Sequence, residues 1–336
     1  MFSEGMSRQP SSVPAGLIET ARRQAGLLNA RQFEAYGLDW DRRKVLIDSG
    51  ALVQVRPRVV LLLAAQPRAV NRSEELDLCR VQTALLGPLA CGPTAVVTGI
   101  PALVLAGVQG APQRFVPEVT LRCGGPCLPR DGVRVRRTPV KESVLCFGVP
   151  CVLPQVALAQ AVCEVSHLTG VALMDSARNR QIIGENDFIA ARRLTFRKRG
   201  SVNAKAWWAE SDPRADSPAE TVARITCTDL GFPPDMLQLK VFDRNGAWVG
   251  RIDLAWRLPD GSWLLGEVDG VDWHNERRQV ERDLNRQNAL LSPITTIRRW
   301  TGGAAFKGRL ADEVAEILSA SGWKPGCPAP SRLYLP

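Results

Sequence analysis

The sequence predicts an α/β protein made of three successive parts: helices followed by a β-hairpin, a mixed α+β middle region, and a C-terminal segment ordered α-β-β-β-α-β-α. Apolar residues recur at helical spacing in some stretches and alternate in others, which distinguishes helices from strands. Asn245-Gly246 and Asp260-Gly261 separate alternating stretches, as expected of hairpin turns. A chain of 336 residues also exceeds one ordinary hydrophobic core, so more than one domain is expected.

The composition is that of a soluble globular protein, with 45% hydrophobic and 23% charged residues. No apolar run approaches the roughly 18 residues that span a bilayer. The N-terminus lacks the basic, apolar and small-residue order of a secretory signal. We therefore expect a cytoplasmic protein with no membrane partner.

The nine cysteines are expected to be reduced in that compartment. Cys123, Cys127, Cys146 and Cys151 form two close pairs, but their spacing matches structural zinc sites only loosely. The pattern favours buried cysteines that behave as small hydrophobic residues.

The net charge of +9 is unevenly distributed along the chain. Residues 1–70 carry 10 Lys+Arg against 6 Asp+Glu, residues 71–200 carry 16 against 10, and residues 201–336 carry 17 against 18. A basic excess favours nucleic acid as a partner through neutralisation of phosphates. A basic N-terminal region together with clustered acids near the C-terminus favours a protein that has both a nucleic-acid-binding region and a candidate catalytic site.

Residues 1–70 have the element order of a winged helix-turn-helix. Asn29 and Asp39 are predicted to cap the second and third helices, and Pro57-Arg58 forms the turn of the hairpin. The expected helices are 15–25, 30–36 and 40–48, and the expected strands are 52–56 and 59–63.

Residues 71–200 are expected to form a mixed α+β middle domain. Helices are predicted at 74–86, 93–104, 155–166, 171–179 and 187–194, and strands at 116–123 and 133–137. The last helix ends in a basic stretch that includes Arg192, Arg193, Arg197, Lys198 and Arg199. This stretch fits a solvated helix end and a contact with the DNA backbone equally well. Residues 201–216 are predicted to be a linker.

Residues 217–322 carry the clearest pattern, and residues 323–336 are expected to be a tail. Ser217-Pro218-Ala-Glu220 is a capping box with proline at the first helical position. The expected order is a helix at 217–230, strands at 238–242, 248–256 and 262–269, a helix at 277–291, a strand at 295–300 and a helix at 310–319.

Four carboxylates occupy particular places in this order. Asp253 lies in the middle of the second strand, and Glu267 and Asp269 share one face at the end of the third strand. Glu220, on the first helix, is expected to complete the group. Clustered carboxylates repel each other unless a cation lies between them, and Mg²⁺ (or Mn²⁺) prefers oxygen ligands. The alternative is a set of surface acids paired with arginines.

Three further residues follow the acidic cluster. His274 comes five residues after Asp269, within reach of a role as general acid or base. Asp283 and Arg286 are one helical turn apart. We expect Arg286 to hold a phosphate with Asp283 supporting it; a surface ion pair between the two is the alternative.

These residues resemble a known group of enzymes. Glu220, Arg-Ile-Asp253, Glu267-Val-Asp269-Gly270 with His274, and Asp283-x-x-Arg286 are similar to the motifs of the very-short-patch-repair-like endonuclease family, within the PD-(D/E)XK superfamily. The resemblance covers about 100 residues. It implies a restriction-endonuclease-like αβββαβ core, metal-dependent phosphodiester hydrolysis, metal ligands at Asp253 and Glu267, and a catalytic His274. The superfamily usually has lysine where this chain has Asp269.

The N-terminal region resembles the winged helix of AbiE-type antitoxins over about 60 residues. The matching residues are Gly26-Leu-Leu, Arg31-Gln-Phe, Gly37-Leu and Ser49-Gly50-x-Leu52-Val-x-Val-Arg56. The resemblance implies that the third helix enters a major groove and that the wing contacts phosphates. The residues expected to contact DNA are Arg42, Arg43, Lys44, Arg56 and Arg58.

We therefore expect a metal-dependent DNA endonuclease with a winged-helix DNA-binding head. Asp253 and Glu267 would hold the metal, Asp269 and Glu220 would orient water or a second ion, and His274 would act as acid or base. The alternative is a DNA-binding regulator or antitoxin whose nuclease fold is catalytically silent.

Overall fold

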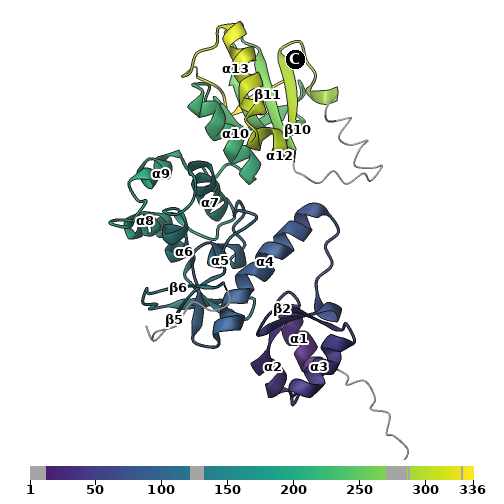
Figure 1. Ribbon diagram of the computed structural model, residues 1–336. Helices are drawn as coiled ribbons and strands as arrows, with labels where there is room; N and C mark the ends of the chain where they lie inside the picture. The colour runs from purple at the N-terminus through teal and green to yellow at the C-terminus, as the bar shows by residue number, and fades with distance from the viewer. Residues whose placement is uncertain (1–12, 122–131, 270–285, 287, 327) are drawn as a thin grey trace, which may run out of the picture. The chain divides into compact units, whose positions relative to one another are not determined.

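The protein is a mixed α/β chain with three β-sheets in the described residues, as a computed structural model shows (Figure 1). The structure describes residues 13–121, 132–269, 286, 288–326 and 328–336. The chain divides into two compact units. Unit 1 contains Met1–Gly107 and Ala111–Ala161, and unit 2 contains Val108–Gly110 and Val162–Pro336. No helix in the described ranges is long and apolar enough to cross a membrane.

The first part of unit 1 has three helices and a small antiparallel sheet. Its elements are α1 (Ala15–Arg23), β1 (Leu27–Asn29), α2 (Ala30–Ala35), α3 (Trp40–Asp48), β2 (Leu52–Arg56), β3 (Val59–Leu62) and the 3₁₀ turn η1 (Leu63–Ala65). The predicted helices and hairpin are confirmed. Asn29 and Asp39 accept hydrogen bonds from the backbone N–H groups of Gln32 and Arg42, so both predicted caps are present. Strand β1 was not predicted, and it extends the sheet to the order β1-β3-β2.

The second part of unit 1 is built on a mixed five-stranded sheet of order β6-β5-β4-β8-β7. Its elements are α4 (Arg72–Cys91), β4 (Ala95–Val97), α5 (Gly99–Leu105), β5 (Glu118–Leu121), β6 (Arg134–Arg136), β7 (Ser143–Cys146), β8 (Val149–Val152) and α6 (Pro154–Ala161). The prediction of one helix over 93–104 is wrong. The fully buried Ala95–Val97 instead pairs with β5, and α5 begins only at Gly99, which has a φ of +61°.

Two of the four closely spaced cysteines belong to this sheet. Cys146 ends β7, and Cys151 lies on β8, where it is buried as the sequence favoured. Cys123 and Cys127 lie outside the described residues.

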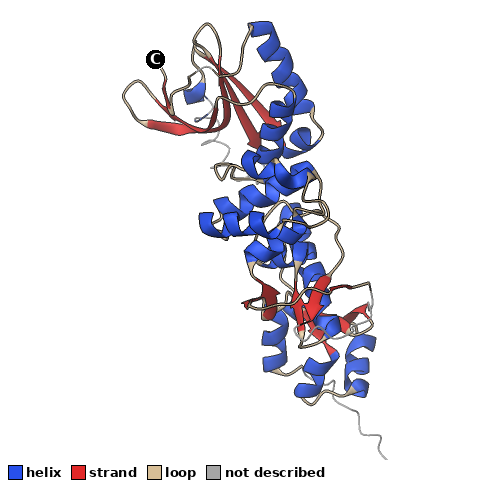
Figure 2. Cartoon of the chain, turned by 90° about the vertical axis from the view of Figure 1, so that its left-hand side faces the viewer, coloured by secondary structure: helices blue, strands red, loops and turns tan. Residues whose placement is uncertain are grey.

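Unit 2 begins with helices and continues into the five-stranded sheet β12-β11-β10-β9-β13 (Figure 2). The helices before the sheet are α7 (His167–Asn179), α8 (Glu185–Leu194), η2 (Asn203–Lys205), α9 (Trp207–Glu210) and α10 (Pro218–Asp229). The sheet and its later helices are β9 (Met236–Phe242), β10 (Trp248–Arg257), β11 (Trp263–Asp269), β12 (Thr295–Thr301), α12 (Gly302–Phe306), α13 (Arg309–Ser321) and β13 (Arg332–Tyr334).

The predicted order of this C-terminal segment agrees with the described elements. The two hairpins β9-β10 and β10-β11 are antiparallel, and β12 lies parallel to β11. Residues 286 and 288–290 are helical, and the rest of the helix predicted at 277–291 lies mainly outside the described residues. Strand β13, in the segment predicted as a tail, pairs with β9. The segment predicted as a linker contains η2 and α9.

Hydrophobic packing covers both faces of the C-terminal sheet. On one face, Trp256, Leu264 and Trp300 pack against residues of α10, α12 and α13. On the other face, Ile252 and Leu265 belong to a second buried cluster that includes Leu290 and Leu333. The polar side chains of β10 and β11 gather where the ladder between these two strands ends, beyond the pair Leu254–Gly266.

Candidate active site

The candidate site lies where β10 and β11 separate. Their ladder reaches Leu254 and Gly266, and Asp253 is the next residue of β10 beyond it. The Asp253 carboxylate accepts a hydrogen bond of 2.8 Å from the backbone N–H of Val268, so the side chain takes the place of a backbone carbonyl. Burial raises the pKa of Asp253, and the hydrogen bonds from Val268 and Gln238 act in the opposite direction.

Glu220 approaches the same place from the first turn of α10. Its backbone N–H donates to Ser217 Oγ at 3.2 Å, which confirms Ser217 as the cap; the reciprocal bond of the predicted capping box, from the Ser217 N–H to the Glu220 side chain, is replaced by one from the Asp216 N–H. Its carboxylate accepts from the backbone N–H of Asp216 and from Gln238 Nε2, at 3.0 and 2.7 Å. Burial, followed by repulsion from Asp253, raises the pKa of Glu220 to about 7. The two carboxylates are therefore close enough to repel each other.

Gln238 joins these two carboxylates, and the sequence analysis did not identify it. It lies on β9 opposite Asp253, between the pairs Leu237–Leu254 and Leu239–Ile252. Its Nε2 is 2.7 Å from Glu220 and 3.4 Å from Asp253, whereas its Oε1 is buried without a hydrogen-bond partner among the described residues. Its φ of +53° is unusual for a non-glycine residue, and such strain concentrates at functional sites.

Glu267 and Asp269 extend the site along β11, and both contact Arg299. In the parallel register Arg299 lies opposite Glu267, and its guanidinium is 3.4 Å from Glu267 and 2.7 Å from Asp269. This shared contact agrees with the prediction that the two acids face the same side. Arg299 was also not identified from the sequence. The sequence feature that could have pointed to it is an arginine inside a predicted strand, between Ile297 and Trp300.

Arg286 is the second cation at Glu267. Its guanidinium forms an ion pair with Glu267 and donates a hydrogen bond of 2.8 Å to the carbonyl of Arg251. A Cβ at Gly250 would come within 2.7 Å of Arg286 Nε, so this glycine leaves room for the side chain. Burial raises the pKa of Glu267, and the two arginines oppose that effect.

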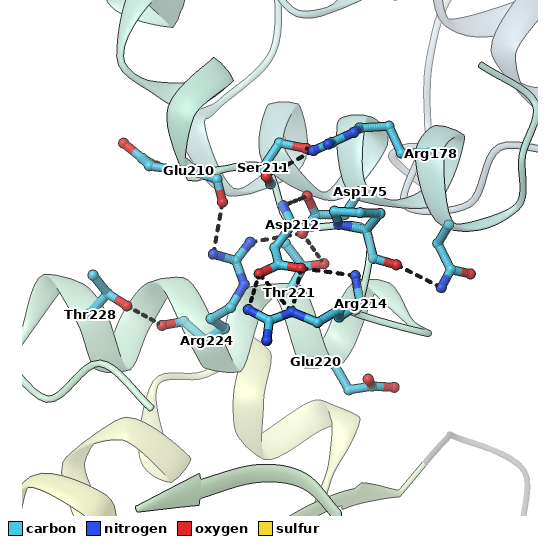
Figure 3. A network of polar contacts seen from close by, with 12 residues as sticks. Asp175, Arg178, Glu210, Ser211, Asp212, Arg214, Glu220, Thr221, Arg224 and Thr228 are labelled. Atoms are coloured by element: carbon cyan, nitrogen blue, oxygen red, sulfur yellow. Dashed lines mark hydrogen bonds and ion pairs between the residues drawn. The ribbon is translucent and has the colours of Figure 1, made fainter. Parts of the chain in front are cut away.

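A buried polar network holds α10, and with it Glu220, in place (Figure 3). Asp175 of α7 is only 1% exposed, and it accepts from Thr221 Oγ1 at 2.9 Å and from Arg224 at 2.8 Å. It also accepts from the backbone N–H of Asp212 at 2.7 Å. Thr221, the residue after Glu220, is therefore held against α7 by its hydrogen bond to Asp175.

Two predicted site residues, His274 and Asp283, lie outside the described residues. Within the described ranges, no group of three or more His, Cys, Asp or Glu side chains is arranged to hold a metal ion. Gln238 nevertheless joins Glu220 to Asp253, and Arg299 joins Glu267 to Asp269. The arrangement is an acidic site with hard oxygen donors, bordered by arginines.

The residues predicted to bind DNA lie on α3 and the β2-β3 hairpin of unit 1. Arg42, Lys44, Arg56 and Arg58 are exposed. Lys44 forms a 2.7 Å ion pair with Asp48 on its own helix. Arg43 is partly buried, with its guanidinium 4.7 Å from the centre of the Trp40 ring. These positions provide exposed positive charge on both elements.

The comparisons with known proteins give a partial match. No family model matches the chain. Two curated proteins of Mycobacterium tuberculosis, "Uncharacterized protein Rv2248" (strain H37Rv) and "Uncharacterized protein MT2308" (strain CDC 1551 / Oshkosh), are each 34% identical to it over 129 residues. The match covers 36% of this chain and 44% of each relative, so the chain spans less than half the length of these relatives.

Proposed function

We propose that unit 2 carries a metal-dependent DNA endonuclease centre where strands β10 and β11 of its five-stranded sheet separate. One observation carries the proposal: Gln238, in a left-handed conformation, joins the buried carboxylate of Glu220 to the partly buried carboxylate of Asp253. Folding alone gives no reason to place two repelling acids and a strained amide together. Buried acids with raised pKa values are typical of functional sites.

The donor set fits a hard divalent cation such as Mg²⁺ or Mn²⁺. Mg²⁺ retains several waters and binds through one or two carboxylates, so Asp253 and Glu267 supply enough protein ligands. The buried Gln238 Oε1, which has no partner among the described residues, is a further oxygen of the type such a cation prefers. When bound, the cation supplies a water of lowered pKa and stabilises negative charge on a phosphoryl oxygen.

The surrounding residues have separate roles in this proposal. Glu220, with a pKa of about 7, holds or releases a proton at neutral pH and orients the attacking water. Arg286 and Arg299 border the acids and contact the phosphate of the DNA strand. Asp269 helps to hold Arg299 in place. His274 is assigned the part of general acid or base, as the very-short-patch-repair-like resemblance implies, and Asp283 is assigned the support of Arg286 from its position three residues before it in the sequence.

We assign DNA binding to the N-terminal part of unit 1. The order α1-β1-α2-α3-β2-β3 supports a winged helix-turn-helix, and the exposed Arg42, Arg56 and Arg58 lie on the third helix and the hairpin. In this arrangement the head binds duplex DNA and the C-terminal domain cuts a strand.

A second function is supported by a specific observation. Arg286 and Arg299 both neutralise Glu267, and an acid, Asp269, occupies the position where the resembling superfamily has lysine. Both features favour a DNA-binding regulator or antitoxin with a catalytically silent nuclease fold. Such a protein would protect a DNA site without metal and without cutting it.

The test compares the wild-type protein with Asp253→Asn and Asp229→Asn on supercoiled plasmid, with Mg²⁺, Mn²⁺ or EDTA. Asparagine at 253 keeps an acceptor for the Val268 N–H but removes the charge. Exposed Asp229, on α10, is the control for loss of one carboxylate. We expect metal-dependent nicking that falls by more than about 100-fold only in Asp253→Asn. Undiminished nicking in that variant would contradict the proposed site, and tight binding without nicking would favour the regulator.

A further inference from the structure

A basic surface with an exposed aromatic ring lies at the C-terminal end of α8 in unit 2. Residues 188–209 contain six basic and no acidic residues. They are Arg192, Arg193, Arg197, Lys198, Arg199 and Lys205. The proposed nuclease site uses none of them. We call the face formed by Ile189, Arg192, Arg193 and Phe196 the α8 face.

The α8 face combines exposed apolar and exposed basic side chains. Its four residues follow helical spacing and line one shallow depression on the surface. Phe196 is 74% exposed and Ile189 is 41% exposed, although both are large hydrophobic residues. The Arg197 guanidinium lies 5.3 Å from the centre of the Phe196 ring. A flat apolar ring is therefore presented to solvent with cations around it.

The turn that carries Phe196 is held firmly. Thr195 is buried, and its Oγ1 donates a hydrogen bond of 2.6 Å to the carbonyl of Arg192. Gly200 has a φ of +86°, and a Cβ there would collide with the backbone carbonyl of Cys163. The exposure of Phe196 is thus a result of a defined backbone and not of a loose chain end.

The arginines of this surface are not neutralised by nearby acids in the part of the chain that the structure describes. Arg192, Arg193, Arg197 and Arg199 form no ion pair there, whereas arginines on other elements pair with carboxylates. Arginine and phenylalanine also occur at protein–protein interfaces. However, residues 188–209 hold six basic and no acidic residues, and positive charge of this density binds a phosphate backbone by neutralising its phosphates. A nucleic acid therefore fits this surface better than a second protein.

We propose that the α8 face binds single-stranded DNA, with an unpaired base stacked on Phe196 and backbone phosphates on the surrounding arginines. Proteins that bind single strands combine aromatic platforms with a positive surface in this way. Duplex DNA offers no free base face for an exposed ring, which is why the ring selects a single strand. The choice of DNA over RNA rests on the proposed nuclease function.

The test measures binding of a short fluorescent single strand by anisotropy in EDTA, so that binding is observed without cleavage. The variants are Phe196→Leu, Phe196→Trp and Arg192→Gln/Arg193→Gln. Phe306→Leu and Arg309→Gln, which alter exposed residues on other elements of unit 2, are matched controls. Folding of each variant is checked by circular dichroism.

We expect Phe196→Leu to weaken single-strand binding by about 5- to 150-fold, because leucine is apolar but does not stack. Tryptophan should retain binding. The double arginine variant should lower the salt dependence of log K by roughly 0.7 for each phosphate that an arginine no longer neutralises. Both control variants should bind as the wild type does.

Four outcomes would overturn the assignment. They are equal binding by wild type and Phe196→Leu, equal losses in the Phe306 control, tighter binding of the matching RNA than of DNA, and self-association that Phe196→Leu abolishes. The binding assay contains no free metal, so it tests the α8 face without depending on cleavage. The nicking assay with Asp253→Asn tests the nuclease site separately, so either proposal can fail without the other.

Discussion

Asp175→Ala should destabilise unit 2 strongly, because Asp175 accepts hydrogen bonds from three groups inside the protein. The carboxylate receives the Arg224 guanidinium at 2.8 Å, Thr221 Oγ1 at 2.9 Å and the backbone N–H of Asp212 at 2.7 Å. Alanine would leave a buried arginine, itself 9% exposed, without its counter-charge. Removing one partner of a buried ion pair costs about 3–5 kcal/mol. We expect a loss of that size in the free energy of unfolding.

The double variant Asp175→Leu/Arg224→Met provides the sharper comparison. Replacing a buried ion pair by apolar residues of similar volume is often neutral or stabilising, because both charges return to water on unfolding. Burial raises the pKa of Asp175 in spite of Arg224, which indicates that the pair does not fully offset its own desolvation. We therefore expect the double variant to lose less stability than Asp175→Ala, although the Thr221 hydroxyl and the Asp212 N–H lose their acceptor and the bond from Arg224 to the Glu210 carbonyl is absent.

Urea unfolding followed by tryptophan fluorescence measures this difference. Eight of the nine tryptophans occur at position 207 or later, so the signal reports mainly on unit 2. Asp229→Ala, on the exposed surface of α10, is the control and should change stability by less than about 0.5 kcal/mol. A loss of less than about 1 kcal/mol in Asp175→Ala would show that Arg224 does not need the carboxylate. A loss in the double variant equal to the summed losses of the two single variants would show that the two charges do not interact.

Two further predictions concern titrating groups. The raised pKa of Glu220, about 7, means that its contribution to stability is present below its usual pKa and is lost as the pH rises through 7. In EDTA, the free energy of unfolding of the wild type should therefore fall between pH 5 and pH 8, and in Glu220→Gln this fall should be smaller by up to about 3 kcal/mol. The same urea titration measures it, and parallel pH curves for the two proteins would contradict the prediction. A hydrogen bond from Cys151 lowers the pKa of Cys146 to about 7, so iodoacetamide should modify Cys146 at neutral pH about ten times faster than the exposed Cys79. Peptide mass spectrometry would measure both rates, which should become similar in Cys151→Ala.

The local elements were predictable because their signals are local. Ser217, Asn29 and Asp39 cap their helices through hydrogen bonds to residues three positions along the chain, and such spacing is visible in the sequence. Asn245-Gly246 and Asp260-Gly261 mark hairpin turns for the same reason. The helix predicted over 93–104 failed because pairing of Ala95–Val97 with a strand more than 20 residues away outweighs local preference.

The candidate site shows the same division. The sequence alone determined that Asp253, Glu267 and Asp269 lie on two neighbouring strands, since alternation and hairpin turns place them there. Only the tertiary structure decided that Gln238 adopts φ +53° between two acids, and that Arg286 and Arg299 neutralise Glu267. These features depend on the register of β9 and β12 and on the depth of burial. A backbone conformation imposed by neighbouring residues, or the burial of a charge, produces no periodic pattern in the sequence from which it could be predicted.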